Sequence, residues 1–399
     1  MKRRRVIIPT FEEIKWMPPT ITLINTLVEL GYDVVYITIY PDEYYNNFDK
    51  NHVSNVYIFS KNIEILKYVK NRLLASVAFR VDLLVKKMIS HFVGLKINRI
   101  LEKEDILWVV NELTVMYAGA RFLKKYKDKY IFTMYELHPH GFKSRNIEKA
   151  ANYACVNVVP EYNRSHMQKL FFKLSDCPMV LPNKPENHPG KKNINIGLED
   201  VEKKINSIKK SGKRIVLYMG IIGEERPLEP FVEAIDKMHE KYEFVIMGRK
   251  SEYLNKLQNK YPDKFTYLGF YNPPLHLHIA SHADIGLLVY VSENSVFGLN
   301  AMYCAPNKIY EYTGFGMPVL TNNIPGLYYT VEMNKIGRCI EFNDKKQIKE
   351  SLENILDNYD KYSENAIKFY KSINTKDSID NILGKFDEKQ NKRIKDSKI

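Results

Sequence analysis

The sequence predicts an α/β protein with two doubly wound, Rossmann-like domains that face each other across a cleft. Short apolar runs alternate with helical segments along most of the 399 residues, which indicates parallel sheets covered by helices on both faces. A polar stretch over Lys184–Arg214 interrupts this alternation and is interpreted as the interdomain connection followed by a solvated helix. Domains contain roughly 100–200 residues, so the length also favours two.

The first half, residues 1–185, is expected to form the N-terminal domain. Its helix over Pro19–Leu30 has apolar residues at helical spacing and ends at Gly31, which suits a C-cap. Strands are expected at Arg5–Pro9, Val34–Ile39, Asp105–Val110 and Tyr130–Met134. These runs are almost entirely apolar, as is typical of strands that are buried on both faces.

The second half, residues 186–372, is expected to form the C-terminal domain. Its strands are expected at Arg214–Gly220, Tyr242–Gly248, Phe265–Gly269, Asp284–Val291 and Pro318–Thr321. Its helices are expected at Pro227–Glu240, Ser251–Lys260, Pro274–His282 and Pro306–Gly314, with more helix from Lys345 onward. Residues 373–399 are interpreted as a C-terminal helix and a charged tail. Because Lys385–Ile399 has six basic and three acidic residues but few apolar ones, we expect it to fray.

Composition restricts the class of protein. Hydrophobic residues make up 45% and charged residues 27% of the chain, a balance that excludes disorder as the main state. The net charge of +13 favours anionic partners. Four distant cysteines, Cys155, Cys177, Cys304 and Cys339, predict buried reduced thiols rather than a disulfide scaffold or a structural zinc site. The apolar stretches are too short for a signal peptide or a spanning helix, so a cytoplasmic location, or one on the inner face of a membrane, is expected.

The most informative stretch runs from Ala305 to Leu320. Pro306 suits the first position of a helix, and Gly314 or Gly316 suits its end. Lys308 and Glu311 are three residues apart and share one face of that helix. At the helix start Lys308 can neutralise phosphate oxygens, and one turn deeper Glu311 can accept hydrogen bonds from the two hydroxyls of a ribose. An ordinary exposed Lys–Glu pair is the alternative interpretation.

A second stretch, Val216–Leu228, has the pattern of a strand, a glycine loop and a helix. The strand ends at Gly220, Gly223 lies in the loop, and Arg226 is expected at the start of the helix. Such a turn lets backbone amides approach a phosphate, and arginine adds a planar set of donors. The stretch is neither a P-loop nor a dinucleotide-binding motif, since the spacing of its glycines fits neither pattern.

These motifs resemble the large family of retaining GT-B glycosyltransferases, the glycosyl transferases group 1 or glycosyltransferase family 4 type. The similar segments follow the family's order: Tyr218–Arg226, Val245–Gly248, Tyr267–Phe270, Ala283–Leu287, Ala305–Tyr312 and Gly316–Val319, with Tyr135–His138 and Leu181–Asn183 in the first half. The resemblance implies an N-terminal acceptor-binding domain and a C-terminal nucleotide-sugar-binding domain. It also implies a UDP- or GDP-linked sugar as co-substrate, with neither a metal nor a covalent cofactor.

The resemblance implies roles for individual residues. Arg226 and Lys308 would bind the donor diphosphate, and Glu311 would bind the ribose. The backbone at Gly220 and Gly223 would lie against the donor, and Gly269 and Phe270 near its base. The catalytic residues would be His138, Arg226 and Lys308, with His138 beside the donor sugar and with His140 and Glu136 as rivals for that place.

The sequence departs from the family in two places. Many members have a glutamate eight residues before the ribose-binding one; here that residue is Tyr303, and Asn300 or a backbone amide is its candidate substitute. The loop Thr10–Pro19 also lacks the glycine pair that often follows the first strand. The missing glutamate motivates an alternative function, a non-catalytic GT-B-like subunit that binds a glycan or a partner glycosyltransferase.

The resemblance favours retention, in which the departing phosphate accepts the acceptor's proton and no strong base is needed. Inversion would need a base on the opposite face, and Glu136 or His138 has suitable chemistry. The expected acceptor is a glycan or a polyprenyl-diphosphate-linked sugar, in the synthesis of a bacterial surface polysaccharide such as a capsule.

The segment Glu64–Arg99 has eight basic and two acidic residues, a net charge of +6. Its apolar residues recur at near-helical spacing, so a basic amphipathic helix on an anionic membrane surface is one interpretation and an ordinary domain helix is the other. Nucleic acid is not an expected partner, because no motif supports it.

Overall fold

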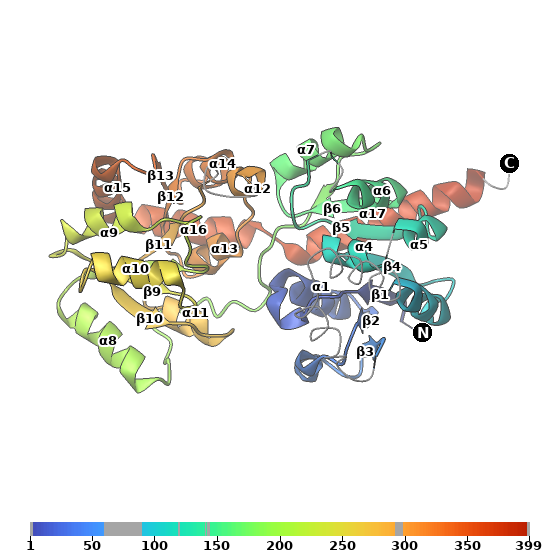
Figure 1. The fold of residues 1–399 in the computed structure, drawn as a ribbon, viewed down its shortest axis with the longest axis horizontal. Helices are drawn as coiled ribbons and strands as arrows, with labels where there is room; N and C mark the ends of the chain where they lie inside the picture. Colours follow the sequence, from blue (N-terminus) through green and yellow to red (C-terminus); the bar gives the residue numbers. More distant parts are fainter. Residues whose placement is uncertain are drawn as a thin grey trace, which may run out of the picture. The chain divides into compact units, whose positions relative to one another are not determined.

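The computed structural model describes residues 3–59, 90–118, 120–139, 141, 144–291 and 298–396. The chain divides into two compact units (Figure 1). The first unit comprises Met1–Pro182 and Asn374–Ile399, and the second comprises Asn183–Ile373. Each unit contains one parallel sheet, so the predicted class of two Rossmann-like α/β domains is confirmed. The sequence placed the boundaries after residues 185 and 372.

The sheet of the first unit has seven parallel strands in the order β3-β2-β1-β4-β5-β6-β7. Their bounds are β1 Arg5–Pro9, β2 Asp33–Thr38, β3 Val53–Tyr57, β4 Ile106–Val110, β5 Tyr130–Thr133, β6 Val156–Val159 and β7 Met179–Val180. The strand order reverses at β1, which lies between β2 and β4. Open α/β sheets bind ligands at such a switch point, outside the carboxyl ends of the strands.

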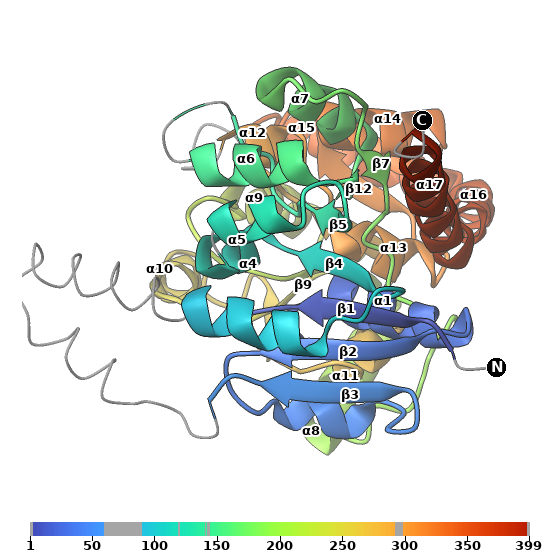
Figure 2. The ribbon, with the colours of Figure 1, turned by 90° about the vertical axis from the view of Figure 1, so that its right-hand side faces the viewer.

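Helices cover both faces of this sheet (Figure 2). One face packs against α1 Pro18–Glu29 and α17 Thr375–Asp396. The other packs against the helical residues 90–100 and against α4 Glu112–Ala118, α5 Ala120–Lys125, α6 Arg145–Tyr153 and α7 Tyr162–Phe172. The side chains of β1 alternate between the two helix layers: Val6 and Ile8 face the first layer, and Ile7 faces the second. Because both faces of this strand are covered, its central residues are all apolar.

The sheet of the second unit has six parallel strands in the order β10-β9-β8-β11-β12-β13. Their bounds are β8 Arg214–Met219, β9 Tyr242–Met247, β10 Thr266–Gly269, β11 Ile285–Leu288, β12 Val319–Asn322 and β13 Gly337–Ile340. One face packs against α8 Glu199–Lys210, α11 Leu275–Ala280, α13 Asn307–Thr313, α14 Pro325–Met333 and α16 Tyr359–Ser372. The other packs against α9 Glu229–Asp236, α10 Glu252–Lys260 and α15 Lys345–Asp357. A short helix, α12 Gly298–Met302, precedes α13.

Every strand that the sequence predicts is present, and β3, β6, β7 and β13 are additional. Three of these additions are edge strands, β3, β7 and β13. In β3 only Val53 is buried, β7 has two residues, and Arg338 interrupts β13. None of the three has the continuous apolar run that marks a strand buried on both faces, which is why periodicity did not identify them.

The C-terminal tail differs from the prediction, since α17 continues as a helix to Asp396. Four of its side chains are buried against the first unit: Ile379, Ile382, Leu383 and Phe386. The later residues are held by polar contacts, because Lys389 donates to the carbonyl oxygen of Cys155 at 3.0 Å and to Asp176 at 2.6 Å. The prediction that Lys385–Ile399 frays is therefore wrong for residues 385–396, which belong to the first unit.

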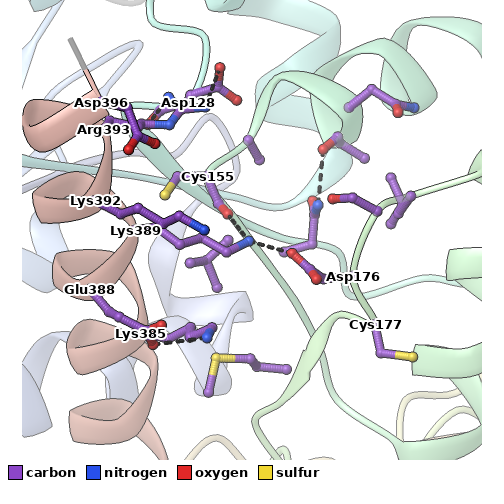
Figure 3. A pocket seen from close by; sticks show the side chains of 18 residues that line it. Asp128, Cys155, Asp176, Cys177, Lys385, Glu388, Lys389, Lys392, Arg393 and Asp396 are labelled. Carbon is purple, nitrogen blue, oxygen red and sulfur yellow. Dashed lines mark hydrogen bonds and ion pairs between the residues drawn. The ribbon is translucent and has the colours of Figure 1, made fainter. Parts of the chain in front are cut away.

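A cavity of about 490 Å³ lies between α17 and the amino ends of β6 and β7 (Figure 3). Three of its cations are paired with acidic side chains: Lys389 with Asp176, Lys385 with Glu388 and Arg393 with Asp128. It lies at the end of the sheet opposite to the carboxyl ends of the strands, so it is separate from the candidate site described below.

All four cysteines are free thiols. Cys155, Cys304 and Cys339 are buried as predicted, whereas Cys177 is exposed. The exposed thiol belongs to the loop that borders the cavity near β7.

Most of the basic segment Glu64–Arg99 lies outside the described residues. Its described end, residues 90–99, is helical and buries Val93 and Ile97 against the sheet. Within the described ranges, no helix has the length and apolar character needed to cross a membrane.

Candidate functional site

The site of the second unit is built at the carboxyl ends of β8 and β11, where the strand order reverses. The loop after β8 begins at Gly220, whose φ of +148° favours glycine. A Cβ atom at this position would lie 2.6 Å from Cε of Lys308. The absence of a side chain at Gly220 thus lets Lys308 lie directly against the loop backbone.

Helix α13 is held over the sheet by Tyr312. The hydroxyl of this buried side chain accepts from the amide of Met219 at 3.1 Å and donates to the carbonyl of Leu217 at 3.2 Å. Its ring covers Gly286, where a Cβ atom would come within 2.3 Å of it. This anchor fixes α13, and with it Lys308, above the end of β8.

The start of α13 differs from the prediction by one residue. Pro306 is the N-cap, with an extended ψ of 130°, and the helix begins at Asn307. Lys308 is therefore the second helical residue, and Gly314 is the C-cap. Lys308 and Glu311 remain one turn apart, as predicted.

Arg226 lies in the turn between β8 and α9 and not at the start of the helix, which begins at Glu229. Its amide donates to the carbonyl of Gly223 at 2.9 Å, so Gly223 closes this turn. Pro227 keeps Arg226 out of the helix, because a residue that precedes proline is disfavoured in the helical region.

The guanidinium of Arg226 lies 4.6 Å from the ring centroid of Tyr290, a cation–π distance. Tyr290 follows β11, and its amide donates to Asn322 at the end of β12 at 3.0 Å. Burial works to lower the pKa of Arg226, but Tyr290 and Tyr218 outweigh it and the pKa is raised. Arg226 therefore keeps its charge at this edge of the sheet.

Lys308 is the second cation at this edge. Burial lowers its pKa, Glu311 opposes that effect, and Arg226 adds to it. Its ammonium makes no hydrogen bond or ion pair with another side chain in the described part of the chain. Because Arg226 destabilises the charge of Lys308, an anion beside both cations is favoured as ligand, which supports the interpretation of a diphosphate site.

The carboxylate of Glu311 is only 13% exposed, and its Oε1 lies 3.7 Å from Nε2 of His276. Burial works to raise its pKa, but His276, Lys308 and His188 outweigh burial and the pKa is lowered. On the main chain, His188 Nε2 donates to the carbonyl of Glu311 at 2.9 Å. Glu311 is thus ionised and available as an acceptor.

Gly269 is the last residue of β10 and pairs with Met247 at the end of β9, and Phe270 follows it. Gly269 has a φ of +103° and accepts at its carbonyl from the amide of Gly248 at 2.9 Å. Phe270 is 43% exposed, with the guanidinium of Arg249 4.6 Å from its ring centroid. The exposed ring offers a flat apolar surface, which is the kind of surface on which a base stacks.

Sequence reasoning missed several residues of this edge: Gly248, Arg249, His276, Tyr290 and Asn322. Position in the sequence could have indicated all of them except His276, because the other four are the last residue of a strand or lie within two residues after it. His276 lies in α11 and reaches Glu311 only through the tertiary fold.

In the first unit, His138 follows β5 and is held by Gln168. The amide of His138 donates to Gln168 at 3.1 Å, and its carbonyl accepts from the same side chain at 3.0 Å. Its Nε2 lies 3.4 Å from Oε1 of Glu112, an ion-pair distance without hydrogen-bond geometry. Glu112 also accepts from the amide of Glu136 at 2.9 Å. A histidine and a carboxylate thus meet at the carboxyl edge of this sheet.

Glu112 is a further residue that sequence reasoning missed, although it follows the predicted strand Asp105–Val110 almost directly. Glu136, one of the two alternatives to His138, has an exposed side chain whose Oε2 lies 3.9 Å from Nη1 of Arg164. The other alternative, His140, lies outside the described residues. Tyr303 follows α12, so no glutamate stands at the family's first position. Among the described residues, no three His, Cys, Asp or Glu side chains gather as a metal site.

The comparisons with known proteins agree with this fold. Residues 200–371 match the model of the family described as glycosyl transferases group 1. No curated protein matches the sequence.

Three solved structures illustrate the similarity of fold. Sucrose-phosphate synthase of Thermosynechococcus elongatus matches with a TM-score of 0.65 and 13% identity, over 97% of this chain and 99% of that one. The E. coli trehalose-6-phosphate protein bound with UDP-2-fluoro glucose matches with a TM-score of 0.63 and 11% identity, over 96% of this chain and 98% of that one. A trehalose-6-phosphate synthase studied for glycosyl transfer with retention matches with a TM-score of 0.63 and 11% identity, over 96% of this chain and 99% of that one.

The two parallel sheets form the GT-B fold, which this chain shares with these solved structures. The segment that matches the glycosyl transferases group 1 model covers most of the second unit. The resemblance on which the sequence predictions rest is thereby confirmed.

Proposed function

We propose that the protein transfers a sugar from a UDP- or GDP-linked donor to a glycan or a polyprenyl-diphosphate-linked acceptor, with retention and without a metal. One observation carries the proposal: Arg226 and Lys308 bring two positive charges to the carboxyl edge of the second sheet, and Glu311 lies one turn beyond Lys308. This arrangement suits the diphosphate and the ribose of a nucleotide laid along α13.

The two cations act most strongly as the donor breaks. Negative charge then grows on the departing diphosphate, and fixed positive groups near it lower the barrier. Tyr290 holds the guanidinium of Arg226 in place, and Gly220 leaves room for the Lys308 side chain. Both groups are therefore positioned before the donor arrives.

Retention requires little acid–base chemistry from the protein. The acceptor oxygen forms a bond to the anomeric carbon, and the bond from that carbon to the diphosphate oxygen breaks on the same face. The acceptor's proton passes to the released diphosphate oxygen. His138 and its partner Glu112 are proposed to bind the donor sugar, in line with the family resemblance. The retaining trehalose-6-phosphate synthase, which has the same fold, supports this stereochemistry.

The first test is a thermal-shift screen with nucleoside diphosphates, because a ligand that binds only the folded state raises stability. We expect UDP or GDP to stabilise the protein and Glu311→Ala to weaken binding by about 3 kcal/mol, the value of two hydrogen bonds to a charged group. Undiminished affinity in the folded variant would refute the ribose assignment.

The second test is transfer from a donor panel to glycan, lipid-linked and sugar-phosphate acceptors, with the anomer of the product determined by NMR. We expect transfer to a glycan or lipid-linked acceptor with the donor's anomeric configuration. Transfer to a sugar phosphate alone would exclude the proposed acceptor class and favour the reaction that sucrose-phosphate synthase is named for.

The second candidate is a non-catalytic GT-B-like subunit, which Tyr303 favours because it stands where many family members have a glutamate. Nucleotide binding without hydrolysis or transfer from any donor would support it. We regard catalysis as the better proposal, because a subunit that only binds glycan has no need of a diphosphate site. The proposed location is the cytoplasm or the inner face of a membrane.

A further inference from the structure

We propose that His276 is a positioning residue that sets how strongly Glu311 distinguishes a ribose from a deoxyribose. The inference rests on the proposed function, because it concerns the acceptor of the ribose hydroxyls. It adds a residue from α11, which neither the motifs nor the family resemblance places at the site.

The first observation is the contact between the two side chains. Nε2 of His276 lies 3.7 Å from Oε1 of Glu311, and the side chains are 18% and 13% exposed. Both groups are thus largely removed from water, where an electrostatic contact is stronger than on an open surface. No other described side chain comes within ion-pair distance of the Glu311 carboxylate.

The second observation concerns the other groups that face Glu311. His188 bonds to its main-chain carbonyl and does not orient the carboxylate. Lys308 and Arg226 supply positive charge, but the side chain of Lys308 lies against Gly220 and that of Arg226 against Tyr290. The orientation of the carboxylate is therefore left to His276.

The third observation is the state of the second imidazole nitrogen. Nδ1 of His276 is buried and has no hydrogen-bond partner among the described residues. A buried polar atom without a partner destabilises the folded protein. A histidine kept only for packing would not need to bear this cost, whereas a functional contact through Nε2 explains it.

The chemical consequence is a division of labour between the two carboxylate oxygens. An N–H at Nε2, in the neutral or the protonated ring, directs one oxygen of Glu311 toward His276. The remaining acceptor capacity is then held toward the ligand, where the 2′- and 3′-hydroxyls donate together. A carboxylate that is free to rotate loses part of this geometry and discriminates less against a ligand that lacks one hydroxyl.

The test is calorimetric titration with UDP, GDP and their 2′-deoxy counterparts, which measures the ratio of the two affinities for each base. We expect the wild type to prefer the ribonucleotide and Glu311→Ala to bind both forms alike. His276→Leu should lower the ratio by about tenfold, the size of one hydrogen bond to a charged group. His278→Leu is the matched control, since it lies on the same helix and should leave the ratio unchanged.

A pair of amide variants tests the geometry and serves if His276→Leu does not fold. Glutamine places its side-chain nitrogen near the position of Nε2, and asparagine places it near Nδ1. His276→Gln should therefore keep most of the ratio, and His276→Asn should lose it. Equal ratios in these two variants would overturn the inference.

The outcomes separate the inference from the function on which it rests. If Glu311→Ala abolishes the ratio and His276→Leu preserves it, His276 does not position the carboxylate, although the nucleotide site stands. If the wild type binds no nucleoside diphosphate, or Glu311→Ala retains the ratio, the proposed function and this inference both fail.

Discussion

Lys308 illustrates at the residue scale how a binding site is prepared. Burial and Arg226 both lower its pKa, and Glu311 opposes them. A bound diphosphate adds negative charge beside the ammonium and so stabilises its charged form, which burial and Arg226 disfavour. The free-energy gain is larger the more charge the phosphate carries, so it is greatest as the leaving group departs.

We therefore expect Arg226→Ala and Lys308→Ala each to reduce turnover by roughly 10²–10³-fold at saturating donor, with little change in melting temperature. Lys256→Ala is the control, because Lys256 pairs with Glu224 beside the same loop but on an exposed face. Full turnover in either site variant would remove that residue from the leaving-group site. EDTA should leave the wild-type rate unchanged.

Lys192 gives a prediction of pH dependence that is independent of the site. Burial lowers the pKa of Lys192 to about 8. The folded state thus binds fewer protons than the unfolded state between pH 8 and the ordinary pKa of about 10.4. In this range stability rises with pH, because the charged form that burial disfavours is lost.

The variant Lys192→Met should remove this contribution, which amounts to at most about 3 kcal/mol. We expect the variant to gain melting temperature relative to the wild type at pH 7 and to lose that advantage near pH 10.5. A difference between the two proteins that stays constant across this range would show that Lys192 has an ordinary pKa.

At the scale of elements, α17 completes the first unit although it follows the second in the chain. Its buried residues lie in the same core as α1 and the central strands. Phe386→Ala should destabilise the first unit by about 3–5 kcal/mol, as large-to-small changes of a buried aromatic do. Ile394→Ala, at an exposed position of the same helix, should cost much less. Chemical denaturation measures both, and equal effects would contradict the packing role.

The basic segment Glu64–Arg99 remains a prediction from the sequence. If it lies on a membrane, each Lys or Arg contributes roughly 1 kcal/mol near an anionic surface. Changing Lys67, Lys70, Lys86 and Lys87 to Glu should then abolish co-sedimentation with anionic vesicles. High salt should weaken the binding of the wild type, since the Debye length falls to about 3 Å at 1 M.

A charge-matched control is available in the second unit. Four exposed lysines of α15 and α16 can be changed to Glu to give the same net charge: Lys346, Lys361, Lys368 and Lys371. This variant should still bind the vesicles. If both charge-reversed proteins sediment like the wild type, or the wild type does not bind, the segment is an ordinary domain helix.

At the scale of the whole molecule, the two units repeat one architecture but differ at their carboxyl edges. The second unit presents two cations and a carboxylate, whereas the first presents the His138–Glu112 pair. A nucleoside diphosphate should therefore slow amide exchange in residues 219–226 and 306–313, by up to about 100-fold at 100 times Kd. Residues 130–138 should exchange as before.

Hydrogen-exchange mass spectrometry measures this difference along the chain, with the nucleoside alone as control. The nucleoside lacks the diphosphate and should protect residues 219–226 much less. Protection confined to residues 130–138 would place the nucleotide in the first unit and contradict the assignment of the two units.

The pattern of apolar residues in the sequence was sufficient to predict most of the strands and the class of the fold. Continuous apolar runs identified β1, β2, β4 and β5 in the first unit, because a strand buried on both faces has no polar positions. The charged end of α17 was misread, because its composition resembles a free tail. Lys389 reaches its partners Cys155 and Asp176 only across the folded unit.

The sequence by itself determined the fold class of the protein and the core of the candidate site, since Lys308 and Glu311 share a helix and Gly220 and Arg226 share a loop. Local spacing places such residues together whatever the rest of the chain does. Only the tertiary structure decided the contacts of His276 with Glu311, of Glu112 with His138 and of Tyr290 with Arg226. Each pair joins segments that are distant in the chain. Parallel strands bring Glu112 to His138 and Tyr290 to Arg226 by placing their carboxyl ends at one edge, whereas His276 and Glu311 meet between the helices α11 and α13.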